Sequence, residues 1–515
     1  MSRSRNSLFN IIFSVFFYLI ILILTFFYRK SFVSNLNNEI LGLNTTLTNL
    51  LSFLNLAELG VGAAVTYFLY QPLHERNSNK IKEIIEILKG IYSKIGFIVL
   101  LVGVVISLFF KIIFSDVDIP NWIIFSTYFV LLFSSLFSYF FNYKQILLLA
   151  DQKNYINIFI FQGSRAIKVL LQIFVLKYGI TGYIYWIALE ALYPIFSSIL
   201  LHYFVQRSYK NILANKSINT QDESERKELS EKIYSKTKQL FFHKLAGFIL
   251  IQGSPLIIYF YTDLNSVAIY GNYLVVITGI TTVVTMIFSS ITPSVGHFLI
   301  SNKIENNYKL YREVQIIELL LVSVICLVYF VLVNHFMIFW MGGKYIFPES
   351  TILLMTVFIF LSLVRVNDTF LTANGLFSDI YAPIIELIIN FVCSVIFGYF
   401  WGINGVLIAI NLSLFVIVFC WKPVFLNYKY FNRSLLRYFV TIFMSTTLLI
   451  LLYFISKMFV DKFLKFDLLI ENLIIVFITI VTYILILFCF NLTFRELLKK
   501  IISHVLILVN KKVLK

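Results

Sequence analysis

Two cations lie close together inside an apolar stretch of the chain. Arg165 and Lys168 occur in FQGSRAIKVLLQIF, residues 161–174, three residues apart and therefore on one face of a helix. If this helix crosses a membrane, each charge costs about 2.5–3.5 kcal/mol on insertion scales, and arginine cannot lose its proton to lower that cost. Such cations are retained either because carboxylates on neighbouring helices neutralise them or because they hold an anionic ligand.

Other ionisable residues also lie within apolar stretches. They are Glu58, Glu190, Lys244, Arg365, Asp368 and Glu386. Glu190 could neutralise Arg165, whereas Arg365 and Asp368, again three residues apart, could pair with each other. Glu58 precedes small residues in NLAELGVGAAV, where it either binds an ion or proton or makes a structural hydrogen bond. Cations and carboxylates are equal in number in these stretches, so both interpretations of Arg165 stay open.

The composition indicates which elements position these side chains. Of the 515 residues, 59% are hydrophobic and 13% charged, whereas soluble proteins have roughly 25% charged residues. Apolar stretches of about 20 residues, enough to cross about 30 Å of hydrocarbon, recur along the chain. We therefore predict an all-α polytopic membrane protein with about fourteen transmembrane helices. The predicted spans are 8–28, 42–70, 91–114, 120–143, 155–178, 181–204, 240–262, 267–292, 316–340, 350–373, 381–400, 403–421, 438–456 and 468–491.

The distribution of positive charge predicts the topology. With the N-terminus in the cytoplasm, 30 of the 42 lysines and arginines fall in cytoplasmic segments and 8 fall outside. This bias predicts that both termini are cytoplasmic. It also accounts for the net charge of +16 without nucleic acid as a partner, because cytoplasmic cations attract anionic membrane lipid.

Two cytoplasmic segments stand out. Residues 78–95 have apolar side chains at helical spacing, which predicts either an amphipathic helix on the membrane surface or an extension of the third span. The polar segment 205–238 separates six spans from eight.

A weak internal repeat accompanies this division. Asp151 and Tyr155 precede one span and Gly179-Ile-Thr-Gly182 opens the next, whereas Asp379 and Tyr381 precede a later span and Gly402-Ile-Asn-Gly405 opens its successor. Both units begin on the predicted cytoplasmic side. Parallel six-span repeats are one transporter design, so the pattern favours six spans, six more, and a final two.

Motifs of enzymes are absent from the sequence. It contains no Walker A sequence, no H-E-x-x-H and no nucleophile elbow, and its four cysteines lack metal-ligand spacing. The longest predicted outer connections are about ten to thirteen residues, too short for a separate active site. We expect a transporter without a cofactor or metal, rather than a membrane-embedded polymerase.

Several stretches resemble one family of transporters. They are LGLNTTLTNLLSFLNLAELGVGAAVTYFLYQPLHERNSNKI (41–81), ADQKNYI (150–156), YGNYLVVITGITTVVTMIFSSITPSVGHF (270–298), FWMGGKYIF (339–347) and ANGLFSDIYAPIIELIINFV (373–392). In this order, over about residues 10–425, they resemble the bacterial flippases of O-antigen and capsule repeat units. That family lies within the multidrug/oligosaccharidyl-lipid/polysaccharide exporter superfamily.

The resemblance implies two six-helix lobes that form a V around a central cavity. Their rocking would move an undecaprenyl-pyrophosphate-linked oligosaccharide across the bacterial cytoplasmic membrane for surface polysaccharide synthesis. The predicted parts are a first lobe (1–204), a linker (205–238), a second lobe (239–425), and two further spans with a tail (426–515). Membrane lipid and the polymerase and chain-length proteins of the pathway are expected partners. The alternatives are a multidrug exporter of the same superfamily and a membrane polymerase.

The resemblance also suggests roles for the charged residues. A cavity that moves a pyrophosphate needs fixed cations, and Arg165, Lys168 and Arg365 are the candidates. Arg29 and Lys30, at the outer end of the first span, either receive the head group after rocking or flank the membrane interface.

The carboxylates Glu58, Glu190 and Asp368 are either coupling groups or structural partners. The seventh span reads LIQGSPLIIYF where relatives often have an acid. That difference argues against ion coupling in this span, and its Pro255 predicts a bend.

The topology can be tested with reporter fusions. Green fluorescent protein fused after Lys515 is expected to fluoresce, and alkaline phosphatase fused there to stay inactive, because the predicted C-terminus is cytoplasmic. Fusions after Lys344, in a predicted outer loop, should give the reverse result. An active phosphatase after Lys515 would contradict the predicted topology.

Overall fold

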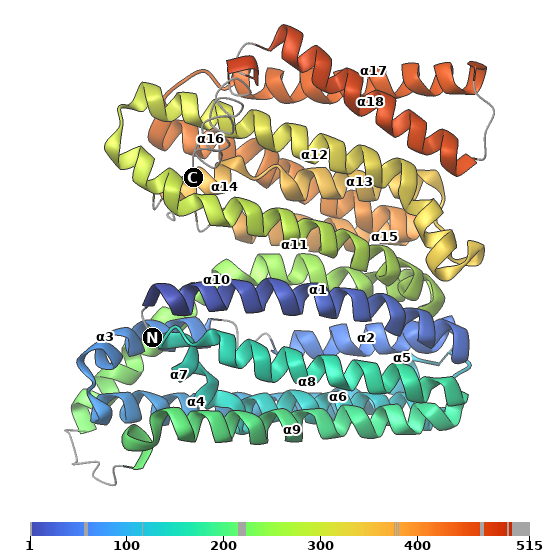
Figure 1. The fold of residues 1–515 in the computed structure, drawn as a ribbon. Coiled ribbons are helices and arrows are strands. Elements are labelled where there is room, and N and C mark those ends of the chain that lie inside the picture. The colour runs from blue at the N-terminus through green and yellow to red at the C-terminus, as the bar shows by residue number, and fades with distance from the viewer. Residues whose placement is uncertain are drawn as a thin grey trace, which may run out of the picture. The chain divides into compact units, whose positions relative to one another are not determined.

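The computed structural model describes residues 3–55, 60–115, 117–214, 223–374, 376, 379, 381–463, 468–491 and 494–496. These residues form helices joined by short connections, with no strand among them (Figure 1). Ten helical stretches within this part of the chain are long and apolar enough to cross a membrane. The predicted all-α polytopic membrane fold is confirmed.

The ten stretches do not correspond one to one with the predicted spans. Asn154–Lys210, of 57 residues, and Tyr381–Phe431, of 51 residues, each contain two predicted spans. The second predicted span corresponds to α2 (Asn38–Leu54) and α3 (Val61–Glu75), and the seventh lies in α10 (Glu223–Tyr261). These three helices are not among the ten membrane-spanning candidates. The number of fourteen transmembrane helices therefore stays a prediction.

The chain divides into two compact units, residues 1–275 and 276–515. The division falls within α11 (Leu264–Ser301). The lobe boundaries on either side of 205–238 remain a prediction. The described parts of that segment are helical, since α9 (Gly179–Ala214) extends into it and α10 begins within it at Glu223.

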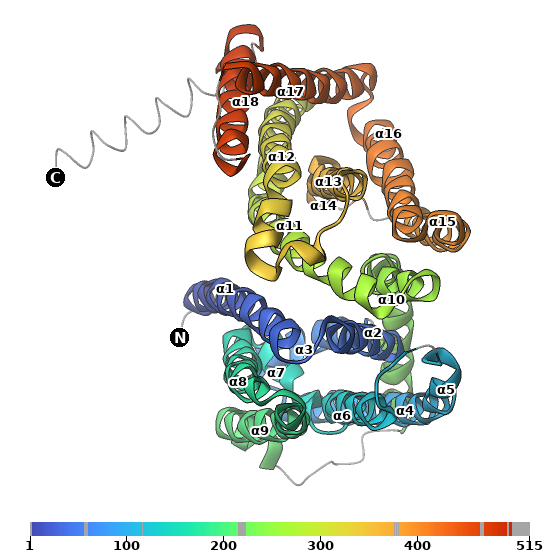
Figure 2. The same ribbon diagram turned by 90° about the vertical axis from the view of Figure 1, so that its right-hand side faces the viewer.

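Unit 1 is built around pairs of long helices. Its other helices are α1 (Arg3–Asn35), α4 (Ser78–Leu108), α5 (Phe110–Ile113), α6 (Asn121–Phe140), α7 (Gln145–Ala150) and α8 (Asn154–Val175). Helix α8 packs between α1 and α9, and α6 packs against both α4 and α9 (Figure 2). The large side chains Phe32, Tyr128, Tyr183 and Trp186 are fully buried in its core. Because α4 is one continuous helix, residues 78–95 extend the third span and do not form a separate surface helix.

Unit 2 contains the remaining helices. They are α12 (Ile304–Met341), α13 (Glu349–Leu363), α14 (Val366–Ala373), α15 (Tyr381–Leu414), α16 (Lys422–Leu426), α17 (Leu436–Phe463) and α18 (Leu468–Phe490), with π-helical turns at Phe415–Trp421 and Asn427–Phe431. Helices α17 and α18 pack together and on α12 (Figure 2). Ile316, Leu327, Leu449 and Tyr483 form the apolar contact there, which attaches the last two predicted spans to unit 2.

The glycines of the internal repeat have matching backbone conformations. Gly179 has φ 60° and ψ −135°. Gly402, which divides α15 into two helical parts, has φ 54° and ψ −128°. Residues with a Cβ rarely adopt a positive φ of this kind. The same turn therefore joins consecutive helices in the two units.

The second glycine of each motif is needed for a different reason. A Cβ on Gly182 would overlap the carbonyl oxygen of Val175, and a Cβ on Gly405 would overlap that of Phe397. In both units the chain returns close to the last turn of the preceding helix, and only glycine fits there.

The aspartates at the opposite end of the repeat each bind an aromatic side chain. The Tyr209 hydroxyl donates to the Asp151 carboxylate at 2.9 Å, and Trp421 Nε1 donates to the Asp379 carboxylate at 2.7 Å. In each unit, the aspartate before one span thus binds an aromatic donor at the end of the next. Tyr209 and Trp421 are not at equivalent positions when Gly179 is aligned with Gly402, so the glycine turns are the feature that supports the internal repeat.

Substitution of the close-approach glycines provides a stability test. Gly182→Ala and Gly405→Ala are each expected to lower the free energy of unfolding by about 1–3 kcal/mol, because the new methyl group overlaps a backbone carbonyl. Gly90→Ala is the control, since a Cβ at Gly90 meets no atom within 4 Å and alanine favours the helix. Thermal unfolding in detergent measures all three, and equal stability of the three variants would contradict the close approach.

Candidate functional site

A buried ion pair joins α8 to α9. Lys168 Nζ lies 2.8 Å from both carboxylate oxygens of Glu190, and Gln172 Nε2 donates to Oε2 of that carboxylate at 2.9 Å. The ammonium also lies 4.6 Å from the ring centroid of Tyr193. The side chains of Lys168 and Glu190 are only 13% and 9% exposed. Lys168, and not Arg165, is therefore the cation that Glu190 neutralises.

Arg165 is exposed on the surface of unit 1. Among the described residues, no hydrogen bond or ion pair joins its guanidinium. At 100° per residue, the exposed apolar residues Ile167, Leu170 and Phe174 lie on the opposite side of α8. Arg165 is thus turned away from the helix face that suits lipid hydrocarbon, and no carboxylate within the described ranges pairs with it.

The two cations near the end of α1 differ in their surroundings. Arg29 is 8% exposed; its Nε donates to the Asn272 side-chain oxygen at 2.5 Å and its Nη2 to the Ala268 carbonyl at 3.1 Å. Arg29 therefore ties α1 to the first turns of α11 within unit 1. Lys30 is exposed, with no partner for its ammonium among the described residues. A head group could reach Lys30 directly, but it could reach Arg29 only after these bonds break.

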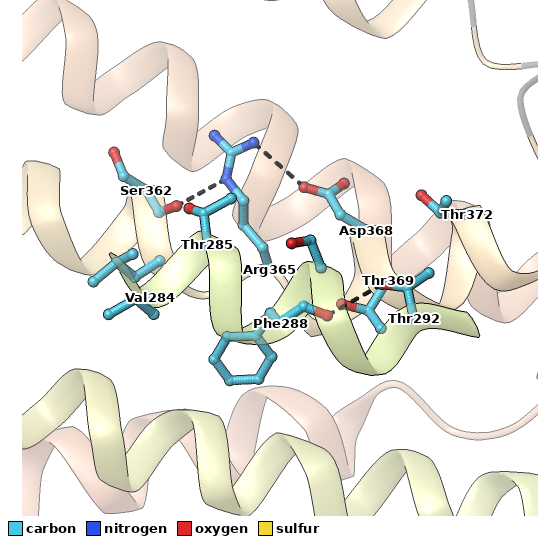
Figure 3. A pocket seen from close by; sticks show the side chains of 11 residues that line it. Val284, Thr285, Phe288, Thr292, Ser362, Arg365, Asp368, Thr369 and Thr372 are labelled. Carbon is cyan, nitrogen blue, oxygen red and sulfur yellow. Dashed lines mark hydrogen bonds and ion pairs between the residues drawn. The ribbon is translucent and has the colours of Figure 1, made fainter. Parts of the chain in front are cut away.

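Unit 2 contains a cavity of about 250 Å³ between α11 and the α13–α14 segment. Arg365 and Asp368 lie side by side in its wall (Figure 3), with 3.5 Å between the guanidinium and the carboxylate. Their predicted pairing is confirmed. Lys422 Nζ binds the other oxygen of Asp368 at 2.5 Å. The remaining wall is rich in hydroxyl groups, from Thr285, Ser289, Thr292, Ser362, Thr369 and Thr372.

A fully buried carboxylate, missed in the sequence, supports this wall. Glu318 on α12 is 0% exposed, and its Oε1 accepts the backbone N–H of Arg365 at 3.0 Å. The chain is interrupted there between α13 and α14, and the same N–H group also donates to the Leu363 carbonyl at 2.9 Å, so the carboxylate is its second acceptor. The sequence feature that could have indicated this carboxylate is the glutamate in QIIELL, two residues inside a predicted span. Lys422 was missed because it was assigned to a cytoplasmic segment.

Two residues selected from the sequence are not placed. Glu58 lies outside the described residues, and nothing is described of the Lys244 side chain. Two separate charged clusters are therefore described, one in each unit. They are Arg165 beside the Lys168–Glu190 pair, and Arg365 with Asp368, Lys422 and Glu318.

No family model and no curated protein sequence matches the chain. Among solved structures, the lipid II flippase MurJ in an inward closed conformation matches with a TM-score of 0.60 at 14% identity, covering 93% of this chain and 98% of that one. An inward-facing multidrug resistance MATE transporter of the MOP superfamily matches with a TM-score of 0.56 at 14% identity, covering 78% and 94%. A mutant of the Vibrio cholerae MATE transporter VcmN gives 0.52 at 12%, covering 81% and 95%.

These comparisons define the class of fold. The chain has the fold of MOP-superfamily transporters, and its structural neighbours are transporters and not enzymes. The neighbours include a lipid flippase and multidrug exporters, and at these identities the similarity is one of fold.

The Lys168–Glu190 pair can be tested with a double-mutant cycle. Lys168→Met or Glu190→Leu alone is expected to lower the free energy of unfolding by about 3–5 kcal/mol, because each leaves a buried charge without its partner. The double variant should regain most of this loss. Thermal unfolding in detergent measures the cycle.

The exposed pair of Lys232 and Glu228 provides the matched control. The same substitutions there should change stability little, singly or together, because water already solvates both charges. Additive losses in the Lys168→Met/Glu190→Leu variant would contradict a coupled pair.

Proposed function

We propose that this protein is a flippase for lipid-linked oligosaccharides. It moves undecaprenyl-pyrophosphate-linked repeat units from the inner to the outer leaflet of the bacterial cytoplasmic membrane by alternating access, for synthesis of O-antigen or capsule. Its lobes, divided at the linker 205–238, rock about the transported head group. The observation that carries the proposal is Arg165, an exposed guanidinium on the side of α8 away from the apolar face.

The charge balance around Arg165 suits an anionic substrate. Glu190 is fully engaged by Lys168 and Gln172, so it does not neutralise Arg165. A pyrophosphate brings its own negative charge and can accept two parallel N–H bonds from a guanidinium. In this proposal Lys168 acts indirectly, because it occupies the carboxylate and leaves the charge of Arg165 for the substrate.

The cavity of unit 2 suits the rest of such a head group. Arg365 and Lys422 both bind the Asp368 carboxylate and keep further N–H groups that can donate to a phosphate. The surrounding serine and threonine hydroxyls can donate and accept hydrogen bonds, as the hydroxyl groups of sugars do. In this proposal Arg165 in unit 1 recognises the phosphate, and the hydroxyl groups of the cavity in unit 2 recognise the sugar.

The carboxylates favour this function over the alternative of multidrug export. A pocket for cationic compounds needs a carboxylate free to pair with them. At the two charged clusters, Glu190 and Asp368 are paired with cations and Glu318 binds the N–H of Arg365. Glu386 interacts electrostatically with both Lys422 and Arg365. We therefore propose structural roles for Glu190 and Asp368. The fold neighbour titled as a lipid II flippase, which covers 93% of this chain, agrees with a lipid-linked substrate.

The function can be tested in a strain that lacks the protein. Complete lipid-linked repeat units should accumulate on the cytoplasmic side, and surface polymer should be lost. The wild-type gene should restore the polymer, whereas Arg165→Gln should restore it about tenfold less or worse, because a charge-assisted hydrogen bond to the substrate is lost. Arg165→Lys should give an intermediate level, since lysine keeps the charge without the planar fork.

The matched control is Arg207→Gln, because Arg207 is an exposed arginine on α9 whose guanidinium contacts only Tyr203 among the described residues. It should complement like wild type, with equal protein amounts on immunoblots. Full complementation by Arg165→Gln would overturn the role of Arg165. Single repeat units that reach the outer surface without the protein would overturn the flippase proposal itself.

A further inference from the structure

A second charged site lies in unit 1, away from the residues proposed for transport. A groove of about 470 Å³ runs between α4 and the first part of α10. Its polar wall consists of Lys94, Arg226, Lys227, Glu86, Ser230 and Tyr234. Three cations therefore face one carboxylate, and the groove has a net positive charge.

The cations of the groove are incompletely paired. Arg226 lies 3.6 Å from Glu86, with the two side chains 50% and 33% exposed. Lys94 and Lys227 are exposed and have no ion-pair partner within the described ranges. The nearby acid Glu228 is already engaged by Lys232 at 2.6 Å. The groove thus has two cations available for an anion.

The walls of the groove are held in place. Ile233 on α10 is 0% exposed in the core of unit 1, and Leu229 packs against that core. On α4, Ile87 and Ile91 are buried beneath the groove. The cations are therefore presented by packed helices, which lowers the cost of ordering them around a ligand.

The sequence of α4 indicates at which level of the membrane the groove lies. Its charged residues end at Lys94, and residues 95–108 contain none. A helix of 31 residues is about 46 Å long, longer than the roughly 30 Å of hydrocarbon. Lys94 therefore marks the level at which α4 enters the hydrocarbon, and Tyr234, 46% exposed, lies where interfacial tyrosines are favoured.

An apolar stripe continues from the groove along the same face of α4. At 100° per residue, Phe97, Leu101 and Leu108 follow Gly90 and Lys94 on one side of the helix. These three side chains are 64%, 65% and 72% exposed. A cationic pocket at the membrane boundary is thus joined to an apolar track that runs into the hydrocarbon.

We propose that this groove binds an anionic phospholipid of the leaflet on the predicted cytoplasmic side. The phosphate lies among Lys94, Arg226 and Lys227, and an acyl chain follows Phe97, Leu101 and Leu108. The bound lipid bridges α4 and α10 and so stabilises unit 1. A free phosphate compound would use the cations but not the apolar track, so the lipid is the occupant that fits both features.

The binding can be measured by native mass spectrometry of the full-length protein in a neutral detergent. The probes are phosphatidylglycerol, phosphatidylcholine with the same acyl chains, and glycerol phosphate as the head group alone. Phosphatidylglycerol should bind more tightly than either of the others. It should also raise the unfolding temperature, because it binds only the folded protein.

Two kinds of variant separate the groove from general electrostatics. Lys94→Gln/Arg226→Gln/Lys227→Gln should bind phosphatidylglycerol about tenfold more weakly or worse, since each cation near an anionic lipid contributes to its attraction. The control Lys80→Gln/Lys210→Gln/Lys303→Gln removes three exposed charges outside the groove and should bind like wild type. Gly90→Phe adds a side chain where a Cβ meets no atom, and it should block the groove without a change of charge.

Three outcomes would overturn the proposal. They are equal binding of phosphatidylglycerol and phosphatidylcholine, an equal loss in the control triple variant, and binding of glycerol phosphate as tight as that of the lipid. The last would indicate a site for a soluble phosphate compound. None of these outcomes bears on transport, so this test and that of the flippase proposal are independent.

Discussion

Hydrocarbon offers no hydrogen-bond partner, so polar groups within a membrane span must find their partners in the protein itself. Several of the described charges follow this constraint. Lys168 and Gln172 on α8 both donate hydrogen bonds to Glu190 on α9. Arg29 donates hydrogen bonds to the side chain of Asn272 and the carbonyl of Ala268. Arg165, exposed and without such a partner among the described residues, is the departure that a transported anion would explain.

The same constraint accounts for the interrupted helix in unit 2. The sequence LSLVRVND around Arg365 contains neither glycine nor proline, so local propensity does not end α13 at Leu363. The backbone of Arg365 nevertheless leaves the helix, with φ −122° and ψ 23°. Glu318, from a different helix, accepts its N–H group. Tertiary contact thus holds the break open, and the break places the Arg365 side chain at the cavity wall.

These examples show which features local sequence can predict. The apolar stretches predicted an all-α membrane fold. The spacing of Arg365 and Asp368 predicted their pairing because Arg365, as the N-cap residue of α14, still lies within one helical turn of Asp368. The choice of Lys168 as the partner of Glu190 depends on how two helices are rotated against each other, and the bond from Glu318 joins residues 47 apart in sequence. Neither geometry is encoded within one helix, so neither could be predicted from spacing.

The internal repeat provides a comparison inside one molecule. If Tyr155 and Tyr381 are equivalent, Lys168 corresponds to Ser394; if Gly179 and Gly402 are equivalent, Glu190 corresponds to Ser413. Both serines are buried, at 1% and 0% exposure, so small neutral side chains suffice for the same helix pair in unit 2. The ion pair in unit 1 is therefore not required by the shared helix packing. Such a pair is often no more stabilising than an apolar replacement, so its presence beside Arg165 agrees with the proposed role of Arg165 in binding an anion.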